Sequence, residues 1–248
     1  MQVSRFALKA HGVSKKFGNY TALTETSLTV PNGCIITILG VNGAGKSTLL
    51  KCLTGYLNST TGTVQVNGYD LYQDEVEVKH RLAFLPDAPV FYPELTIWEH
   101  LHFISHAFCD TQDIENRAAS ILRTLGIFNA RNLLPHALSR GMQLKAALSL
   151  ILIRPFNVFF LDEPTSSLDP VGVKILEKIL DVCRCGGASI LMTTHDISLA
   201  ERLSNEIWHM VEGRLQFNAE SNMDSTSLTT KSSVEVGDID YRYRPIKA

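Results

Sequence analysis

A chain of 248 residues with 45% hydrophobic and 19% charged side chains has the composition of an ordinary globular protein and is long enough to bury a full core. A formal net charge of -2 gives no overall attraction to nucleic acid or to anionic lipid, so nucleic acid is not expected as a partner. Five cysteines without a repeating spacing do not form a disulfide framework, and a cytosolic protein with reduced thiols is the simplest interpretation.

No stretch of the sequence has the length and uniform apolar character of a membrane span. The longest apolar stretch, residues 146–161, is interrupted by Arg154, Pro155 and Asn157, and the first residues contain no apolar signal-peptide core. We therefore expect a chain that neither crosses a membrane nor carries a secretion signal.

Residues 6–30 alternate polar and apolar side chains on either side of Gly18, a pattern that predicts two strands joined by a hairpin turn. Phe17 and Tyr20 flank that turn. An exposed aromatic ring there can stack on a nucleotide base, with Phe17 as the first candidate and Tyr20 as the second. Packing within the sheet is the alternative for either ring.

The residues from Gly40 to Ser47 match the phosphate-binding pattern GxxxxGK(S/T), between an apolar run typical of a buried strand and a segment with helical spacing. Glycines let the backbone N–H groups converge on one anion at the helix N-terminus. Lys46 adds a charge for the β- and γ-phosphates, and Ser47 a hydroxyl group for Mg²⁺. A glycine turn that binds nothing is the alternative. The predicted nucleotide-binding residues here are Gly40, Asn42, Gly43, Ala44, Gly45, Lys46, Ser47 and Thr48.

Two short strands are predicted at residues 62–68 and 82–86, where glycines and a proline bound them, and they fit a sheet with antiparallel pieces. The pattern then becomes helical. Thr96 and Glu99 have the spacing of a capping box in front of an amphipathic helix at residues 97–108.

Two more amphipathic helices are predicted at residues 114–125 and 142–153. The histidines of this region lack carboxylate or cysteine partners, so we expect surface or core residues and not metal ligands. They are His100, His102, His106 and His136.

Residues 157–161 predict a strand that is buried on both faces and ends in two carboxylates, Asp162 and Glu163. In a nucleotide site, Asp162 can hold Mg²⁺ through water while Glu163 orients or deprotonates the attacking water. An acidic turn without such a role is the alternative. A strand at residues 189–194 ends in His195, which is expected to point into the same crevice.

Beyond residue 217 the sequence is rich in Ser, Thr and Asp and has no periodicity. Residues 218–248 are therefore expected to form a tail or a small appendage of unknown role.

Over about residues 4–217 the chain resembles the ATP-binding subunits of ABC transporters, whose motifs occur here in the family's order. Leu138-Ser-Arg-Gly-Met stands where the family has its signature LSGGQ, residues 166–169 resemble the D-loop, and residues 194–196 resemble the switch histidine. The resemblance implies an α/β fold, the P-loop NTPase ABC ATPase cassette: a RecA-like core, an antiparallel β subdomain and a helical subdomain inserted at about residues 91–153, within a domain of residues 1–217.

The resemblance also implies an ATPase, with ATP and Mg²⁺, that works on the cytoplasmic face of the membrane through an integral membrane permease subunit. Lys46, Glu163 and His195 would be its catalytic residues and Phe17 its adenine-stacking aromatic. Ser139, Gly141 and Asp169 of one subunit would act on the ATP of a second ATP-binding subunit, in a head-to-tail dimer that we expect to be a homodimer. Physical reasoning agrees, because the helix N-terminus after Ser139 is a second anion site that one chain cannot aim at its own bound phosphate.

Two features, at three positions, depart from the family pattern. Arg140 and Met142 replace the consensus glycine and glutamine of the signature, and Asp87 stands where many members carry a Mg²⁺-sensing glutamine. These features resemble the branch that serves two-component exporters, so we expect export, with Asp87 as a third metal-binding residue beside Ser47 and Asp162.

The sequence alone leaves three alternatives to an export ATPase open. They are an uptake-type subunit, a soluble ABC protein acting on ribosomes or DNA, and a nucleotide sensor without turnover. A second GxxxxGK(S/T) and sustained heptads are both lacking, which argues against the soluble class, and Glu163 argues against the sensor.

Overall fold

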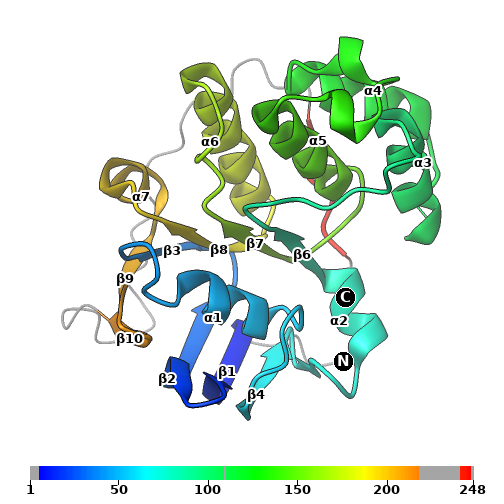
Figure 1. Ribbon diagram of the computed structural model, residues 1–248. Helices are drawn as coiled ribbons and strands as arrows, with labels where there is room; N and C mark the ends of the chain where they lie inside the picture. The colour runs from blue at the N-terminus through cyan, green and yellow to red at the C-terminus, as the bar shows by residue number, and fades with distance from the viewer. Residues whose placement is uncertain (1–5, 109, 218–240, 247–248) are drawn as a thin grey trace.

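The computed structural model describes residues 6–108, 110–217 and 241–246. Their centre is a six-stranded sheet in the order β10-β9-β3-β8-β7-β6 (Figure 1). The strands are β3 (Ile35–Leu39), β6 (Leu82–Leu85), β7 (Val158–Asp162), β8 (Ser189–Thr194), β9 (Glu206–Val211) and β10 (Arg214–Phe217). Neighbouring strands are parallel except for β9 and β10. Every residue of β3, β7 and β8 is buried, which explains why their sequences are mostly apolar and do not alternate.

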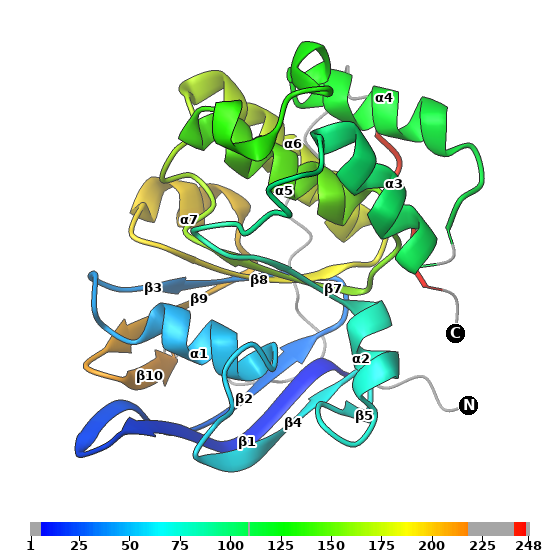
Figure 2. The same cartoon turned by 45° about the vertical axis from the view of Figure 1, so that its right-hand side comes forward.

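A four-stranded antiparallel sheet in the order β2-β1-β4-β5 forms a second layer. Its strands are β1 (Phe6–Phe17), β2 (Tyr20–Pro31), β4 (Thr61–Val66) and β5 (Tyr69–Asp70). Helix α1 (Lys46–Leu53) lies between the two sheets (Figure 2). Phe17 pairs with Tyr20 across the tight turn between β1 and β2, as the sequence predicted.

Helices cover the other face of the central sheet (Figure 2). Three of them lie between β6 and β7 in the chain, and we call them the helical lobe: α3 (Ile97–Ala107), α4 (Ile114–Thr124) and α5 (Arg140–Leu152). Short 3-10 turns at Phe128–Ala130 and Pro135–Ala137 connect α4 to α5. Helices α6 (Pro170–Cys185) and α7 (Ile197–Leu203) complete this layer, and α2 (Glu75–Arg81) lies beside β6.

The central sheet separates two hydrophobic clusters. Phe159 and Ile190 face the cluster formed with the helical lobe and α6, whereas Phe160 and Leu191 face the cluster formed with α1 and the antiparallel sheet. Trp208 of β9 is fully buried in the second cluster, where its indole N–H donates to Glu206 Oε1 at 2.7 Å. Because both faces of the sheet are covered, the strands that carry the site are held on two sides.

The helices expected at residues 97–108, 114–125 and 142–153 are all present, within two residues of the predicted ends. The strand predicted at residues 189–194 is confirmed, and that at 157–161 begins and ends one residue later. Helix α2 and the β9–β10 hairpin were not predicted. Of the tail expected at residues 218–248, residues 218–240 and 247–248 lie outside the described residues, and residues 241–246 form an extended segment.

Among the helices of residues 6–108, 110–217 and 241–246, none has both the length and the hydropathy needed to cross a bilayer.

Candidate functional site

The predicted phosphate loop follows β3 and leads into α1, which begins at Lys46. Gly43 and Gly45 have φ angles of 81° and 105°, in the left-handed region that favours glycine. Gly40 is required for another reason, because a Cβ atom there would lie 2.5 Å from the carbonyl oxygen of Met210. A cavity of about 460 Å³ opens between the loop and residues 209–212.

Lys46 is only 5% exposed, and its ammonium group faces the start of the loop. Nζ donates to the carbonyl oxygen of Gly40 at 2.6 Å and to that of Val41 at 3.3 Å. It also lies 3.1 Å from Oε1 of Glu163, at the end of β7. The structure thus joins the phosphate loop to the carboxylate pair that the sequence placed on a distant strand.

Asp162 is a buried carboxylate, 2% exposed, at the last position of β7. Its Oδ1 accepts hydrogen bonds from Ser47 Oγ at 2.9 Å and from Thr193 Oγ1 at 2.7 Å. Among the described residues, no group of three or more His, Cys, Asp and Glu side chains forms a metal site. The hydroxyl and carboxylate oxygens of Ser47 and Asp162 nevertheless fit Mg²⁺, which prefers few protein oxygens and keeps several waters.

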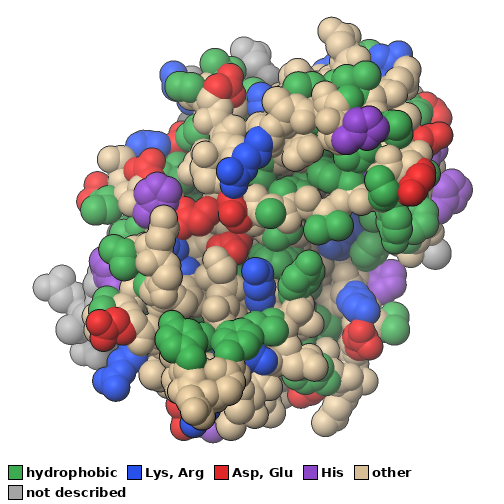
Figure 3. All heavy atoms as spheres, viewed as in Figure 1, with side chains coloured by type: hydrophobic (Ala, Val, Ile, Leu, Met, Phe, Trp, Pro, Cys, Tyr) green, Lys and Arg blue, Asp and Glu red, His purple; other side chains and the backbone are tan. Residues whose placement is uncertain are grey.

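Glu163 follows β7 with a φ angle of 47°, which is uncommon for a residue other than glycine. Its N–H donates to the main-chain oxygen of Thr193 at 3.2 Å and to Thr193 Oγ1 at 3.1 Å. Its Oε2 lies 2.9 Å from Nδ1 of His195, which is 63% exposed. Acidic side chains gather at the middle of the face in Figure 3, between α1 and the helices above it.

The remaining residues of the predicted phosphate loop lie in the turn between β3 and α1 or in the first turn of α1. Ala44 is buried and its carbonyl oxygen accepts from Gly213 N at 2.8 Å, Asn42 is exposed, and Thr48 lies in the first turn of α1. These contacts attach the loop to the β9–β10 hairpin.

Ser139 and Gly141 belong to a second group of residues, at the N-terminus of α5. The Ser139 hydroxyl oxygen caps the helix by accepting from Met142 N at 3.3 Å. A Cβ atom at Gly141 would lie 2.7 Å from the carbonyl oxygen of Ser167, so α5 closely approaches the segment before α6. The signature residues therefore contact the D-loop residues within one chain.

Asp169 caps the next helix, α6. Its Oδ1 accepts from Gly172 N at 3.0 Å and lies 3.5 Å from Lys145 Nζ of α5. The hydrogen bond from the Gly172 backbone, followed by the charge of Lys145, holds the pKa of the Asp169 carboxyl below its usual range. The carboxylate form is therefore favoured at this contact between α5 and α6.

Asp87 lies with this second group. Its Oδ1 accepts from Ser166 Oγ at 3.1 Å and lies 3.6 Å from the guanidinium of Arg140. Two of the three positions that depart from the family pattern, Asp87 and Arg140, thus contact each other. Metal binding by Asp87 stays a prediction.

Phe17 lies at the end of β1 and not in the phosphate loop or at the N-terminus of α5. Its ring is 49% exposed at the end of β1, and Lys15 Nζ lies 5.0 Å from the ring centre. Tyr20, the second candidate, is more exposed. Stacking on a base by Phe17 stays a prediction.

Sequence reasoning missed two residues that connect these parts. Thr193 contacts both Asp162 and Glu163, and Lys145 pairs with Asp169. Thr193 carried a signal, since two threonines close an otherwise apolar strand directly before His195. Lys145 carried none, because a single lysine on a helix is usually solvated.

Known proteins resemble the chain over most of its length. A family model described as ABC transporter matches residues 23–166. The ABC transporter ATP-binding protein YthP of Bacillus subtilis is 32% identical over 217 residues, 86% of this chain and 87% of that protein. The lantibiotic transport ATP-binding protein SrtF of Streptococcus pyogenes is 26% identical over 208 residues, 84% and 88% of the two chains.

A solved structure described as the ATP-binding subunit of an ABC transporter superposes with a TM-score of 0.78 at 27% identity, over 86% of this chain and 90% of that one. This confirms the α/β fold class of the P-loop NTPase cassette. Since the family model and the relatives run through the phosphate loop and β7 alike, the chain belongs to the ABC transporter family as an ATP-binding subunit.

Proposed function

We propose that this ATP-binding subunit hydrolyses ATP with Mg²⁺ to drive export through a separate integral membrane subunit. The observation that carries the proposal is the convergence of Lys46, Asp162, Glu163 and His195 beside one phosphate loop. A protein that only binds nucleotide does not need Glu163 in addition to Asp162.

In this proposal the loop N–H groups and Lys46 bind the β- and γ-phosphates, and Phe17 stacks on the adenine. Ser47 and Asp162 hold Mg²⁺ through oxygen atoms and water, with Asp87 as a third candidate ligand. The bound ion would neutralise charge on the phosphate oxygens. These are the roles predicted from the sequence, and the side-chain contacts of Lys46, Ser47 and Asp162 support them.

Glu163 is the proposed general base. It takes a proton from the water whose oxygen bonds to the γ-phosphorus, while the bond from that phosphorus to the bridging oxygen breaks and ADP leaves. His195, 2.9 Å from Glu163 Oε2, orients the carboxylate. Lys46 pairs with the same carboxylate, so the phosphates of ATP must take over Lys46 before Glu163 is free to act.

The second group of residues serves a composite site in a head-to-tail dimer. The N-terminus of α5, with Ser139 and Gly141, presents backbone N–H groups to an anion. Asp169 caps α6 beside it. We propose that these groups complete the ATP site of a second copy of the chain.

The proposed ATPase domain spans residues 1–217, and its helical part at about residues 91–153 receives the membrane subunit on the cytoplasmic face of the membrane. Export is supported by Asp87, by the form of the signature at Arg140 and Met142, and by the likeness to a lantibiotic transport protein. Residues 218–240 are left without a proposed role.

Affinity purification of the tagged chain from detergent-solubilised membranes tests this function. We expect an integral membrane protein to copurify and the complex to hydrolyse ATP faster than the isolated chain. A Lys46→Ala chain is the control, because it should retain the partner and lose the hydrolysis. Purification with ribosomes or DNA, and without a membrane protein, would contradict the proposal.

A further inference from the structure

The extended C-terminal segment, residues 241–246, lies against the seam between the helical lobe and the rest of the molecule. Tyr241 is buried and belongs to the same hydrophobic cluster as Cys183 of α6. The Tyr243 hydroxyl group donates to the carbonyl oxygen of Phe156, whose ring stacks edge-on at 5.1 Å. The side chain of Asn157 donates to the carbonyl oxygen of Ile246 at 3.3 Å. The segment therefore has anchors along its length.

The end of α6 is shaped to receive this segment. A Cβ atom at Gly186 would overlap the ring of Tyr243. Gly186 has φ and ψ angles of -80° and 0°, which any residue adopts easily, so its backbone does not require glycine. What requires glycine there is the close approach of Tyr243.

An ion-pair group around the buried carboxylate of Asp110 ties the segment to the helical lobe. Asp110, between α3 and α4, accepts from Arg117 of α4 at 2.7 Å and from Arg244 of the segment at 2.9 Å. Arg117 also donates to the carbonyl oxygen of Ile153, directly after α5. Asp110 is only 9% exposed, and removing one cation from a buried carboxylate leaves charge that is costly to desolvate.

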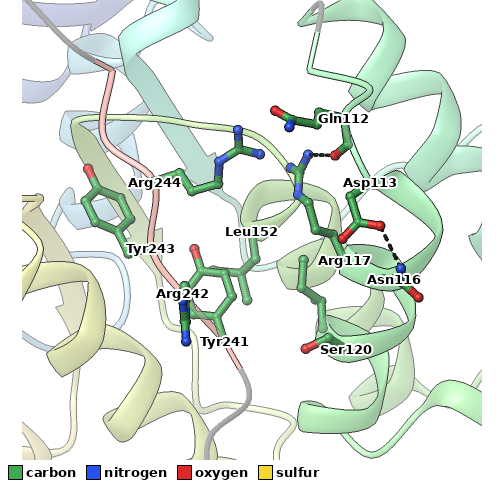
Figure 4. A pocket seen from close by; sticks show the side chains of 11 residues that line it. Gln112, Asp113, Asn116, Arg117, Ser120, Leu152, Tyr241, Arg242, Tyr243 and Arg244 are labelled. Carbon is green, nitrogen blue, oxygen red and sulfur yellow. Dashed lines mark hydrogen bonds between the residues drawn. The ribbon is translucent and has the colours of Figure 1, made fainter.

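Between these anchors the segment does not pack closely on α4. A cavity of about 600 Å³ separates them, with Asn116 and Ser120 on one wall and Tyr241 and Arg242 on the other. Figure 4 shows Arg117 and Arg244 reaching toward each other across its upper end. The segment thus spans from α6 to the helical lobe through its anchors at Tyr241, Tyr243 and Arg244, with a cavity between them.

We propose that this seam is a docking site for an extended Tyr-x-Tyr-Arg segment and that residues 241–246 of the same chain occupy it. The docked segment holds the helical lobe against the core. The segment contacts two different parts of the molecule. Tyr241, Tyr243 and Ile246 contact α6 and the residues just before β7, whereas Arg244 contacts Asp110 of the lobe. The segment has this role in the free chain as well as in the chain with nucleotide, independently of ATP hydrolysis.

The first test compares two full-length variants, Arg244→Glu and Arg242→Glu. Glu at position 244 faces Asp110 with a like charge and should release the segment. Arg242, two residues away, is exposed and makes none of the contacts above, so its variant has the same charge change and is the matched control. Both variants are studied without nucleotide, so the comparison between them tests the docking even if the ATPase proposal fails.

Thiol labelling with a maleimide, mapped by mass spectrometry, reports release. Cys183 is buried beside Tyr241, and Cys34 and Cys52 are buried elsewhere and serve as internal controls for global unfolding. We expect Arg244→Glu to label at Cys183 at least about tenfold faster, as local opening predicts, with unchanged labelling at Cys34 and Cys52. Equal rates at Cys183 in Arg244→Glu and Arg242→Glu would overturn the docking.

Hydrogen exchange over residues 114–124 tests the hold on the lobe in the same variants. We expect exchange in α4 to quicken by about fivefold or more in Arg244→Glu only, as a loosened local unit predicts. Faster labelling of Cys183 with unchanged exchange in α4 would overturn the claim that the segment holds the lobe.

A steric cycle provides an independent test. Gly186→Ala should release the segment in the wild-type background by collision with Tyr243, and should have little further effect on labelling at Cys183 in a Tyr243→Ala background. An equal effect of Gly186→Ala in both backgrounds would mean that Gly186 does not act through the segment, against the proposal.

Discussion

Glu163 is the central residue of the candidate site, because the side chains of three other residues contact it. Its carboxylate pairs with Lys46 on one oxygen and with His195 on the other, and its main chain has a φ angle of 47°. Non-glycine residues in this region cost about 1–3 kcal/mol and are retained where the surroundings over-determine them. The N–H bonds to Thr193 supply that constraint here.

Lys46→Ala should abolish tight ATP binding. The loop N–H groups alone would then face several negative charges without the buried ammonium, and charge-assisted hydrogen bonds are the strong ones. Equilibrium binding of a fluorescent ATP analogue measures this, with Lys51→Ala, in the last turn of α1, as a control for loss of charge on that helix. Unchanged affinity in Lys46→Ala would exclude the phosphate-loop role.

Glu163→Gln should lower the ATPase rate by about 100-fold or more while ATP still binds, because the amide keeps the shape and loses the base. Steady-state phosphate release measures the rate. His195→Gln is the companion variant, and a smaller loss there agrees with an orienting role. A Glu163→Gln chain with near wild-type turnover would show that the base is another group.

Asp87→Ala should leave ATP binding by the isolated chain nearly intact and weaken ATPase activity in the complex with the membrane subunit. The Asp87–Arg140 pair is exposed on both sides, so its contribution to stability is below about 1 kcal/mol and loss of folding is not expected. The measurement is the ATPase rate with and without the membrane subunit, with Arg140→Ala as the matched variant. Equal stimulation of wild type and Asp87→Ala would make Asp87 an ordinary loop carboxylate.

The sequence revealed much of the site because its residues follow strand ends and a fixed glycine pattern. Lys46, Asp162 and Glu163 could be placed near one another from the order of motifs. The pairing of Arg140 with Asp87 could not, since it depends on how α5 packs on the loop after β6. Nor could the bonds of Thr193, because the two threonines at the end of β8 mark polar positions but do not indicate which groups they bond.

At the scale of elements, the helices with the clearest apolar period and caps were the best predicted. Helix α3 begins where its capping box begins, with Thr96 Oγ1 accepting from Glu99 N and Glu99 Oε2 accepting from Thr96 N. Helix α2 was missed because it buries only Val78, so seven residues carry almost no periodic pattern. The β9–β10 hairpin was missed because β10 has only four residues, too few to establish an alternating pattern.

Thr96→Ala should destabilise the protein by about 1 kcal/mol, the usual cost of removing an N-cap side chain. Urea unfolding followed by circular dichroism measures it, and Thr96→Ser, which retains a hydroxyl group, is the control. A stability equal to that of the wild type would show that α3 is held by packing and not by its cap.

The cap should also respond to acid. Hydrogen bonds from the Thr96 backbone and then from its hydroxyl group lower the pKa of Glu99 from its ordinary value of 4.5. A lowered folded-state pKa means that the stabilisation is present above pH 4.5 and is lost as the pH falls through the folded pKa. Glu99→Gln should therefore differ from wild type at pH 6 and converge with it in acid. A difference between the two that stays constant with pH would contradict this.

At the scale of the whole molecule, the proposed head-to-tail dimer assigns the two groups of site residues to two different nucleotides. Trapped ATP in Glu163→Gln should hold two chains together, because the N-terminus of α5 in one chain then covers the phosphates bound by the other. Gel filtration with and without ATP measures the shift. The Lys46→Ala/Glu163→Gln double variant should stay monomeric, and a purely monomeric Glu163→Gln chain with ATP would exclude a homodimer.

The burial of Trp208 gives the protein a built-in optical probe. The chain has two tryptophans, and the other, Trp98, lies in α3 with its ring 5.6 Å from His102. Each face of the central sheet thus has its own fluorophore, Trp208 in the cluster with α1 and Trp98 against the cluster with the helical lobe. Trp98→Phe leaves the emission of Trp208, next to residues 209–212 of the phosphate-loop cavity. Trp208→Phe leaves the emission of Trp98, which follows the helical lobe, so nucleotide arrival and lobe movement can be recorded as separate signals without any attached dye.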